Sequence, residues 1–396
     1  MHVLPRLLDW HIVTYYRFRM TAPHAITSLA LENFRNYRSL SLAVPPGPVI
    51  LTGRNGVGKT NILEALSLLS PGRGLRGARL REMDNMAAPN AAFVVAVTVQ
   101  SRGEETRIGI GRDPEADIEK RILKINGGKE RRQRALTSHV AVQWLTPAMD
   151  QVFVEGGSAR RRLLDRITFN FTPEHAERVA AYEHAMRERN RLLAERSRAD
   201  LYWLSVLEQQ MAEHAIAVTL ARLETMERLA AQLAGGIAAF PAARLLLQGA
   251  IEAWLEQGAT ALEAESRFAE RLMELRVVDA AIGRATEGPQ RSNLSVIHGD
   301  TGRAAEQCST GEQKALLLAI ILAAARARTE WCGLPPILLL DEVVAHLDVD
   351  KRRCLFDLIS ASLVQAWMTG TDAADFQGLD RNAAHVKIDG GTVRIC

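Results

Sequence analysis

The segment that most constrains this chain is an octapeptide at residues 53–60, GRNGVGKT. It fits the pattern G-x-x-x-x-G-K-[ST], in which backbone N–H groups converge on the phosphates of a nucleotide. An apolar run at residues 48–51 precedes it, as expected of a buried strand, and a stretch with helical periodicity follows. A chance glycine-rich turn is the alternative, but strand, turn and helix occur in the order that a phosphate loop needs. The sequence therefore predicts a nucleoside triphosphate site.

Each residue of this loop has an expected role. The side chain of Lys59 is expected to reach the β- and γ-phosphates, and the hydroxyl of Thr60 to ligate Mg²⁺. The remaining residues would bind phosphate mainly through the backbone and the helix N-terminus. The expected nucleotide-binding residues of the loop are Gly53, Arg54, Asn55, Gly56, Val57, Gly58, Lys59 and Thr60.

A second motif lies far along the chain, where the apolar run PILLL at residues 336–340 is followed by Asp341 and Glu342. In a phosphate-loop ATPase, an Asp after such a strand holds the Mg²⁺ shell, so Asp341 is the second expected metal residue, with Thr60. Glu342 is expected to polarise the attacking water, which makes it the expected catalytic residue together with Lys59. Two adjacent carboxylates could instead be ordinary charges at a helix N-terminus. The upstream phosphate loop favours the ATPase interpretation.

Between these motifs, the stretch STGEQKALLL begins a long apolar helix. Ser309 followed three residues later by Glu312 predicts a capping box, and a well-capped helix is one interpretation. The other is a signature of ATP-binding-cassette (ABC) type, in which the helix N-terminus contacts the γ-phosphate held by the opposite subunit. The motif order of loop, signature and Asp-Glu strand favours this second interpretation. The expected signature residues are Ser309, Thr310, Gly311 and Glu312.

Two further residues have expected roles in an ABC-type site. Asp348 falls where such ATPases place an inter-subunit aspartate loop. Gln143, in AVQWLTP, could be the Mg²⁺-facing glutamine of these enzymes or an ordinary strand glutamine, and the sequence leaves both open.

Nucleic-acid binding would depend on local basic patches, because the net charge of the 396 residues is only +3. There are three basic runs, and a solvated surface is the alternative for each. The first is favoured as a DNA contact through Arg73, Arg76 and Arg79, because it follows the phosphate-loop helix. The other members of the basic runs are Arg81; Lys129, Arg131, Arg132 and Arg134; and Arg160, Arg161 and Arg162.

No apolar run in the sequence reaches the length of a membrane span.

The pattern along the chain predicts four parts. Residues 1–20 are expected to form an N-terminal extension. It is either a disordered tail or a segment that is not translated, because translation begins at Met20. Residues 21–171 form the first half of an ATPase head, with a hairpin at 26–44 and strands near 91–100, 106–112, 121–127 and 140–149. Residues 172–285, rich in Ala, Leu, Glu and Arg, form an inserted helical arm. Residues 286–396 complete the head, with a strand at NLSVIHG and the later motifs.

Four stretches resemble one family closely: LENFRNYRSLSL, LTGRNGVGKTNILEALSLLSPGRGLR, WLTPAMDQVFVEGGSARRRLLD and LLLDEVVAHLDVDKRRCLFDL, with STGEQKALLL in the same pattern. They are similar to the RecF family of bacterial DNA replication and repair ATPases, from Ile26 to the end. The resemblance implies an α/β fold: an ABC/SMC-type phosphate-loop ATPase head with an inserted, mainly helical subdomain. It also implies a cytoplasmic ATP-dependent homodimer with slow, DNA-stimulated ATPase activity.

The resemblance further implies binding to single- and double-stranded DNA at gap junctions, and loading of RecA with RecO and RecR in recombination repair, replication restart and the SOS response. Gln290 and Asn293 depart from the His and Asp usual in the family, which puts any special role of these two side chains in doubt. A transporter ATPase subunit is the alternative, but Thr369 to Thr371 stand where such subunits place a histidine. A small-molecule phosphotransferase would need neither STGEQ nor the Asp348 loop.

Overall fold

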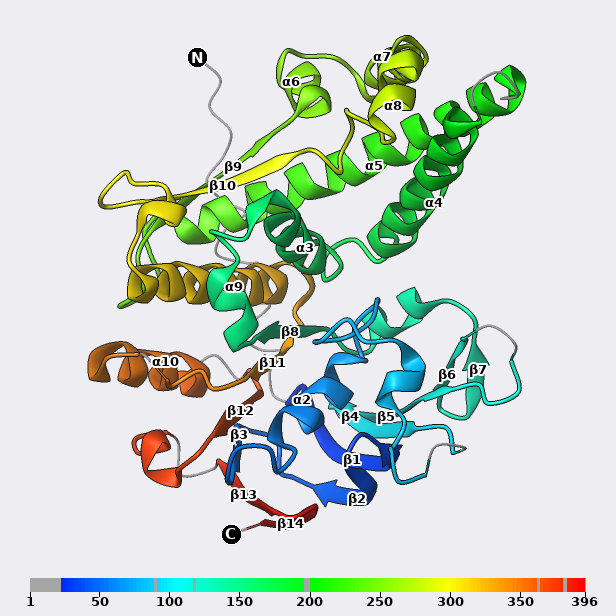
Figure 1. Cartoon of the computed structure of the whole chain (residues 1–396). Coiled ribbons are helices and arrows are strands. Elements are labelled where there is room, and N and C mark those ends of the chain that lie inside the picture. The colour runs from blue at the N-terminus through cyan, green and yellow to red at the C-terminus, as the bar shows by residue number, and fades with distance from the viewer. Residues whose placement is uncertain are drawn as a thin grey trace. The chain divides into compact units, whose positions relative to one another are not determined.

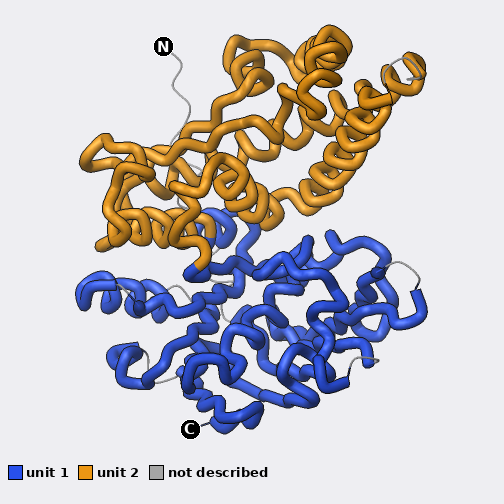
Figure 2. Tube along the Cα trace, in the orientation of Figure 1, with its two compact units in different colours: residues 1–147, 325–396 blue, residues 148–324 orange. Residues whose placement is uncertain are grey.

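The computed structural model describes residues 23–88, 91–116, 119–195, 200–345, 347–361, 364–379 and 383–395. The expected N-terminal extension and Met20 lie outside these residues. The chain divides into two compact units (Figure 2). Unit 1 comprises Met1–Pro147 and Ala325–Cys396, and unit 2 comprises Ala148–Ala324.

Unit 1 contains a six-stranded, mostly parallel sheet with the order β14-β13-β3-β12-β11-β8. Every neighbouring pair is parallel except β13 and β14. The central strands are buried along nearly their whole length, which explains their unbroken apolar sequences. The strands are β3 (Val49–Thr52), β8 (Val142–Leu145), β11 (Ile337–Leu340), β12 (Ala366–Gly370), β13 (Ala384–Asp389) and β14 (Thr392–Ile395).

The second sheet of unit 1 is antiparallel, with the order β2-β1-β4-β5-β6-β7. The expected hairpin is confirmed, with Leu31 opposite Leu40, and so are the expected strands at β4, β5 and β6. Alternating burial along β4 gives the sheet one core face. The strands are β1 (Ala25–Phe34), β2 (Tyr37–Ala43), β4 (Val94–Ser101), β5 (Glu104–Arg112), β6 (Arg121–Ile125) and β7 (Gly128–Glu130).

The helices of unit 1 are few among the residues described. Helix α2 (Lys59–Ser67) follows β3, and α10 (Val349–Ala361) follows β11 (Figure 1). The last turns of α9 (Thr310–Cys332) also belong to this unit, from Ala325 onward. Short 3₁₀ turns occur at η1 (Leu80–Met83), η2 (Gln133–Ser138) and η6 (Ala373–Phe376).

Unit 2 is mainly helical, and α4 and α5 form a long helical hairpin (Figure 1). Its apolar core joins α4, α5, α6 and α7 through residues such as Leu207, Met211 and Phe268. The helices are α3 (Gly156–Thr168), α4 (His175–Ala194), α5 (Leu201–Leu233), α6 (Ala250–Glu256), α7 (Ala261–Glu274), α8 (Arg276–Ile282) and the first part of α9, with 3₁₀ turns at η3 (Pro147–Gln151) and η5 (Ala305–Gln307).

Residues 172–285 are mainly helical, as expected, but they also contain a strand that was not predicted. Strand β9 (Ala243–Gln248) interrupts them and pairs antiparallel with β10 (Asn293–His298), with Leu246 opposite Ser295. The sequence ARLLLQ has good helix formers, but pairing with β10 stabilises it as a strand, because strand preference depends strongly on context. The strand expected at NLSVIHG is confirmed as β10.

The two compact units do not follow the boundaries expected from the sequence. The expected arm, residues 172–285, lies within unit 2, which extends beyond it at both ends. Helix α3 packs on α5 and β10, and β10 pairs with β9, so the flanking segments belong to the same core. The division into two half-heads and an inserted arm stays a prediction.

Candidate nucleotide site

The glycine-rich loop links the end of β3 to the start of α2 at one edge of the parallel sheet. Gly53, Gly56 and Gly58 have φ angles of 151°, 81° and 113°, a region that favours glycine. A Cβ atom on Gly58 would lie 2.6 Å from Asn36 Nδ2 and 2.7 Å from Tyr37 Oη. Gly58 is therefore needed both for its backbone conformation and for the close approach of the β1–β2 hairpin.

Lys59 is buried inside this loop, with 5% of its surface exposed. Its Nζ donates hydrogen bonds to Gly53 O at 2.6 Å and Arg54 O at 3.0 Å. Burial lowers the pKa of Lys59, and the nearby carboxylates of Glu342 and Asp341 act in the opposite direction. The structure thus brings the expected lysine close to both carboxylates of the second motif.

Asp341 connects three segments of unit 1 at the carboxyl ends of neighbouring strands. Thr60 Oγ1 lies 3.0 Å and 3.1 Å from its two carboxylate oxygens. Thr369, at the end of β12, donates to Asp341 Oδ1 at 2.7 Å and accepts from the Glu342 amide at 2.8 Å. Hydroxyl and carboxylate oxygens are the ligands that Mg²⁺ prefers, so Thr60 and Asp341 fit the expected metal.

Glu342 has a backbone conformation that side-chain-bearing residues rarely adopt, with φ at 47°. Such local strain costs on the order of 1–3 kcal/mol and persists where the surroundings enforce it. Here the hydrogen bond from its amide to Thr369, which is fully buried, fixes the turn after β11. This positioning role of Thr369 was not predicted. The sequence indicated only that Thr369 to Thr371 stand where transporter ATPase subunits place a histidine.

A polar network behind the loop was not predicted from the sequence. Asn36 Nδ2 donates to Val57 O at 3.0 Å, and Asn61 Nδ2 donates to Asn36 Oδ1 at 2.7 Å. Arg76 Nη1 then donates to Asn61 Oδ1 at 2.8 Å. Asn36 lies within the expected hairpin at 26–44, and no local signal marks its contact with a loop 21 residues away. The hairpin therefore supports the glycine loop directly.

The three arginines expected to contact DNA differ in their surroundings. Arg76 forms an ion pair of 2.5 Å with Glu64, which is fully buried and also holds Arg35. All three arginines are exposed, and the Arg76 side chain keeps 41% of its surface accessible. Arg76 therefore differs from Arg73 and Arg79 in its ion pair with Glu64 and not in its exposure.

The capping box at the start of α9 is confirmed. The Glu312 amide donates to Ser309 Oγ at 3.3 Å, and the Ser309 amide donates to Glu312 Oε2 at 2.7 Å. Ser309, Thr310 and Gly311 are exposed. Hydrogen bonds from Ser309 lower the pKa of Glu312. The signature role of this helix end stays a prediction, because Ser309 lies in unit 2 and the glycine loop in unit 1.

The other two expected residues lie in unit 1, and their roles also stay predictions. Asp348 is exposed and caps α10, accepting from the Lys351 amide at 2.8 Å and from Lys351 Nζ at 2.6 Å. Gln143 is fully buried in the middle of β8, opposite Leu338. This position suits an ordinary strand glutamine, one of the two alternatives left open.

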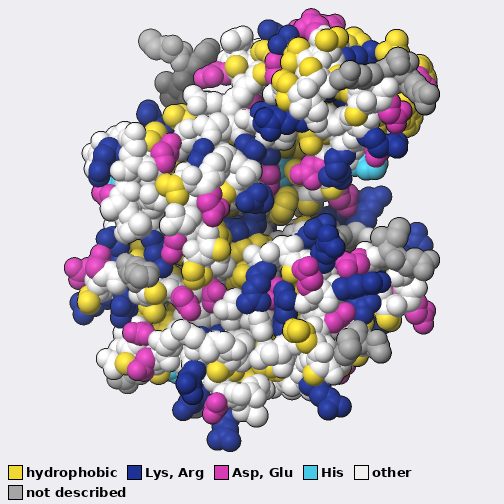
Figure 3. Space-filling view, in the orientation of Figure 1, with side chains coloured by type: hydrophobic (Ala, Val, Ile, Leu, Met, Phe, Trp, Pro, Cys, Tyr) yellow, Lys and Arg dark blue, Asp and Glu magenta, His cyan; other side chains and the backbone are white. Residues whose placement is uncertain are grey.

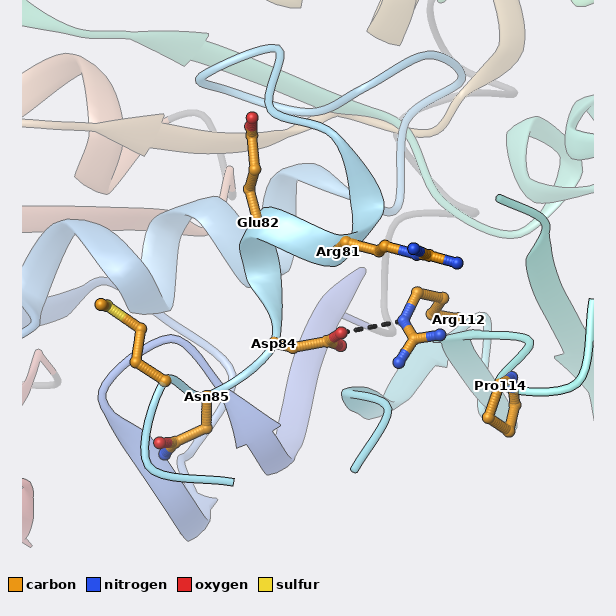
Figure 4. A pocket seen from close by; sticks show the side chains of 7 residues that line it. Arg81, Glu82, Asp84, Asn85, Arg112 and Pro114 are labelled. Atoms are coloured by element: carbon orange, nitrogen blue, oxygen red, sulfur yellow. Dashed lines mark hydrogen bonds and ion pairs between the residues drawn. The ribbon is translucent and has the colours of Figure 1, made fainter. Parts of the chain in front are cut away.

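Two further pockets hold charged side chains whose groups largely satisfy one another. One, of about 630 Å³ in unit 1, contains the 2.9 Å ion pair of Asp84 with Arg112 beside the exposed Met86 (Figure 4). The other, of about 200 Å³ in unit 2, is lined by Asp165 and Arg222, among others. Burial opposes ionisation of Asp165, but Arg222 and a hydrogen bond from His175 outweigh it and lower its pKa to about 2.

The two residues that depart from the family pattern both have internal partners. Tyr182 Oη donates to Gln290 Oε1 at 2.5 Å, and Arg160 Nη2 donates to Asn293 Oδ1 at 2.9 Å. Both bonds lie within unit 2, so these side chains have structural roles.

A glycine-rich loop, an Asp-Glu strand end beside it and a mainly helical second unit define the head of a phosphate-loop ATPase of SMC type. A family model described as the RecF/RecN/SMC N-terminal domain matches residues 25–392. The DNA replication and repair protein RecF of Rhizobium rhizogenes is 45% identical over 94% of this chain and 99% of its own length. The DNA replication and repair protein RecF of Agrobacterium fabrum is 43% identical over 94% of this chain and 99% of its own length. This chain belongs to the RecF family.

Solved structures agree on the fold. A structure of the recombination mediator protein RecF-ATPrS in the RecFOR pathway has a TM-score of 0.82 at 23% identity, covering 94% of this chain and 98% of that one. An Smc head domain derived from Pyrococcus furiosus, bound to the C-terminal domain of ScpA, has a TM-score of 0.51 at 16% identity. The match covers 94% of this chain and 96% of that chain. No described helix is both long and apolar enough to cross a membrane.

Proposed function

We propose that this protein is an ATP-dependent DNA-binding clamp of RecF type, which dimerises with ATP and, with RecO and RecR, promotes loading of RecA at gaps in DNA. The observation that carries the ATPase part is the joining of Thr60, Asp341 and Glu342 at one edge of the parallel sheet. Family membership supports the repair role, and the cytoplasm is the location that we propose with it.

In this proposal the loop amides and Lys59 bind the phosphates of ATP. Thr60 and Asp341 would hold Mg²⁺, which when bound would supply positive charge that stabilises the charge developing during phosphoryl transfer. Lys59 leaves its two carbonyl partners to contact phosphate. Glu342 orients the attacking water and accepts its proton, and Thr369 keeps the Glu342 backbone in place. The resulting ATPase is slow and is stimulated by DNA.

The second part of the proposal is a site shared between two subunits. The exposed start of α9, with Ser309, Thr310 and Gly311, would contact the nucleotide of the partner. Helix N-termini favour anions, since their first amides lack partners within the helix. Asp348, exposed at the start of α10, would face the partner as well. ATP binding would then close the dimer, and hydrolysis would release it.

Sizing the protein by light scattering tests this proposal. We expect a dimer with ATP and Mg²⁺, a monomer with ADP or no nucleotide, and a longer-lived dimer when gapped DNA is added. The Lys59→Met variant is the matched control, because it loses the phosphate contact and should stay monomeric with ATP. A parent protein that remains monomeric with ATP and gapped DNA would contradict the clamp. ATPase activity that responds to lipid and not to DNA would favour a transporter subunit.

A further inference from the structure

Two basic runs that lie about sixty residues apart in the sequence meet in unit 1. Gln133 Oε1 accepts hydrogen bonds from the Gly72 amide at 3.0 Å and from Arg121 Nη1 at 3.4 Å. Arg121 Nη1 also donates to Gly72 O at 3.2 Å. Gly72 directly precedes Arg73, and Gln133 directly follows Arg132. The side chains of Gln133 and Arg121 therefore hold the loop after α2 against the turn after β7.

The charges at this junction are largely uncompensated. Arg73, Lys129, Arg131 and Arg132 are exposed, and none forms an ion pair with a carboxylate in the part of the chain that the structure describes. We call these four residues the basic surface. Glu130 is the acidic residue within the two stretches 71–79 and 128–134. Figure 3 shows several Lys and Arg side chains on the part of unit 1 near β5 and β6, with some Asp and Glu side chains among them.

Arg121 adds positive charge beneath the basic surface. Burial lowers its pKa to about 10, which is still well above neutral pH, so the guanidinium stays charged. Two of its nitrogen atoms, Nε and Nη2, are buried without a hydrogen-bond partner among the described residues. A buried, charged group of this kind increases the attraction of the surface above it for anions.

We propose that the basic surface binds the phosphodiester backbone of duplex DNA, an inference that rests on the proposed function and assigns its DNA contact. Guanidinium groups form paired hydrogen bonds with phosphate oxygens, and such contacts fix position without selecting a sequence. Neither stretch contains an aromatic residue, so stacking on exposed bases plays no part. The contact thus involves two runs, and Arg76 is left out of the basic surface because its charge is paired with Glu64.

The salt dependence of DNA affinity tests the inference, because each phosphate contact contributes about 0.9 to the slope of log K against log salt concentration. A short duplex of mixed sequence is the probe. Arg131→Ala with Arg132→Ala should lower the slope by about 2, and adding Arg73→Ala by nearly 3 in total. The control is Arg187→Ala with Arg191→Ala in α4, which removes the same charge from side chains already paired with Glu183 and Glu188. The control should keep the parent slope.

A further variant tests whether the two runs act as one surface. Gln133→Ala keeps every charge but removes the hydrogen bonds to Gly72 and Arg121, so DNA affinity should fall several-fold with an unchanged thermal midpoint. An unchanged affinity would overturn the joint surface. An unchanged salt slope in the Arg131 and Arg132 variant, with a parent that binds DNA, would overturn the inference and leave the proposed function standing. A parent that does not bind duplex or gapped DNA would instead overturn the proposed function.

Discussion

Asp341 and Glu342 are adjacent, yet the structure gives them different surroundings. Asp341 is buried and accepts hydrogen bonds from Thr60 and Thr369. Glu342 is partly exposed, and its left-handed backbone turns it away from the course of β11. A bound metal needs a fixed carboxylate, whereas a general base needs access to water. The division of roles proposed for this pair follows from these differences.

Glu342→Gln should separate binding from hydrolysis. The amide keeps the size of the side chain but cannot accept a proton, so ATP hydrolysis should fall by roughly 10²–10⁴-fold. ATP affinity should stay near that of the parent, and the dimer on DNA should persist longer. Steady-state hydrolysis and nucleotide binding measure these effects, with Asp341→Asn as a comparison that should weaken Mg²⁺-dependent binding. Parent-like turnover by the Gln variant would place the base elsewhere.

His24, just before β1, makes stability depend on pH. Burial, with the nearby charges of Arg328 and Arg102, lowers its pKa from 6.5 to about 4. The unfolded chain therefore binds a proton between these values while the folded chain does not. The contribution of His24 to stability is complete above pH 6.5 and is lost as the pH falls toward 4.

Between pH 7 and pH 5 this difference corresponds to about 2 kcal/mol of unfolding free energy. The Gln side chain of His24→Gln cannot take up a proton. When the pH is lowered from 7 to 5, the unfolding free energy of this variant should therefore fall by about 2 kcal/mol less than that of the parent protein. Urea titrations of both proteins at the two pH values measure this. Parallel losses in the two proteins would show that His24 does not titrate in this way.

At the scale of secondary structure, the most predictable parts were those with a local pattern. The loop glycines, the apolar runs of β3 and β11 and the Ser309 to Glu312 cap are each defined by neighbouring residues, and the structure has them. Strand β9 was missed because it forms through pairing with β10, about fifty residues later. The bonds of Asn36 and Gln133 were missed for the same reason, since the partner of each lies far along the chain.

In unit 2, a buried ion network holds the helical hairpin together. Arg189 of α4 is fully buried and donates to Glu208 of α5 at 2.9 Å, to Asp279 of α8 at 2.7 Å and to Leu272 O at 2.6 Å. Arg276 also contacts Glu208. Removing one partner of such a pair leaves a buried charge uncompensated, which is strongly destabilising.

Arg189→Met should therefore lower the unfolding free energy of unit 2 by about 3–5 kcal/mol. Arg187→Met, two residues earlier on the same helix, is the control. Its side chain is 62% exposed, so the change should be within about 0.5 kcal/mol. Urea unfolding followed by circular dichroism gives both values. Equal stability of the two variants would show that the network contributes little.

At the scale of the whole molecule, the residues of the proposed ATP site are divided between the two compact units. The glycine loop, Asp341 and Glu342 belong to unit 1, and Ser309 belongs to unit 2. Family membership and the exposed helix end support a site completed by a second copy of the chain. In such a dimer, each nucleotide would lie between the loop of one subunit and the α9 start of the other.

Ser309 needs a variant that separates its two roles. Loss of a helix cap alone costs about 1 kcal/mol of stability, so Ser309→Ala should stay folded and should retain hydrolysis if the hydroxyl serves only as a cap. Ser309→Arg would block the helix end in the dimer without changing the glycine loop. Lys59→Met has the opposite effect, since it removes the loop contact and leaves the helix end intact.

The most direct test of the shared site is to mix these two inactive variants and measure DNA-stimulated ATP hydrolysis. Two Ser309→Arg subunits can form only damaged sites, and the same is true of two Lys59→Met subunits, which should stay monomeric with ATP. In the mixed dimer both changes fall on one site, and the other is intact. We predict that mixing restores part of the parent activity, because one of the two sites in each mixed dimer is intact. If mixed dimers are shown to form and hydrolysis stays at the level of the separate variants, the shared-site account is contradicted.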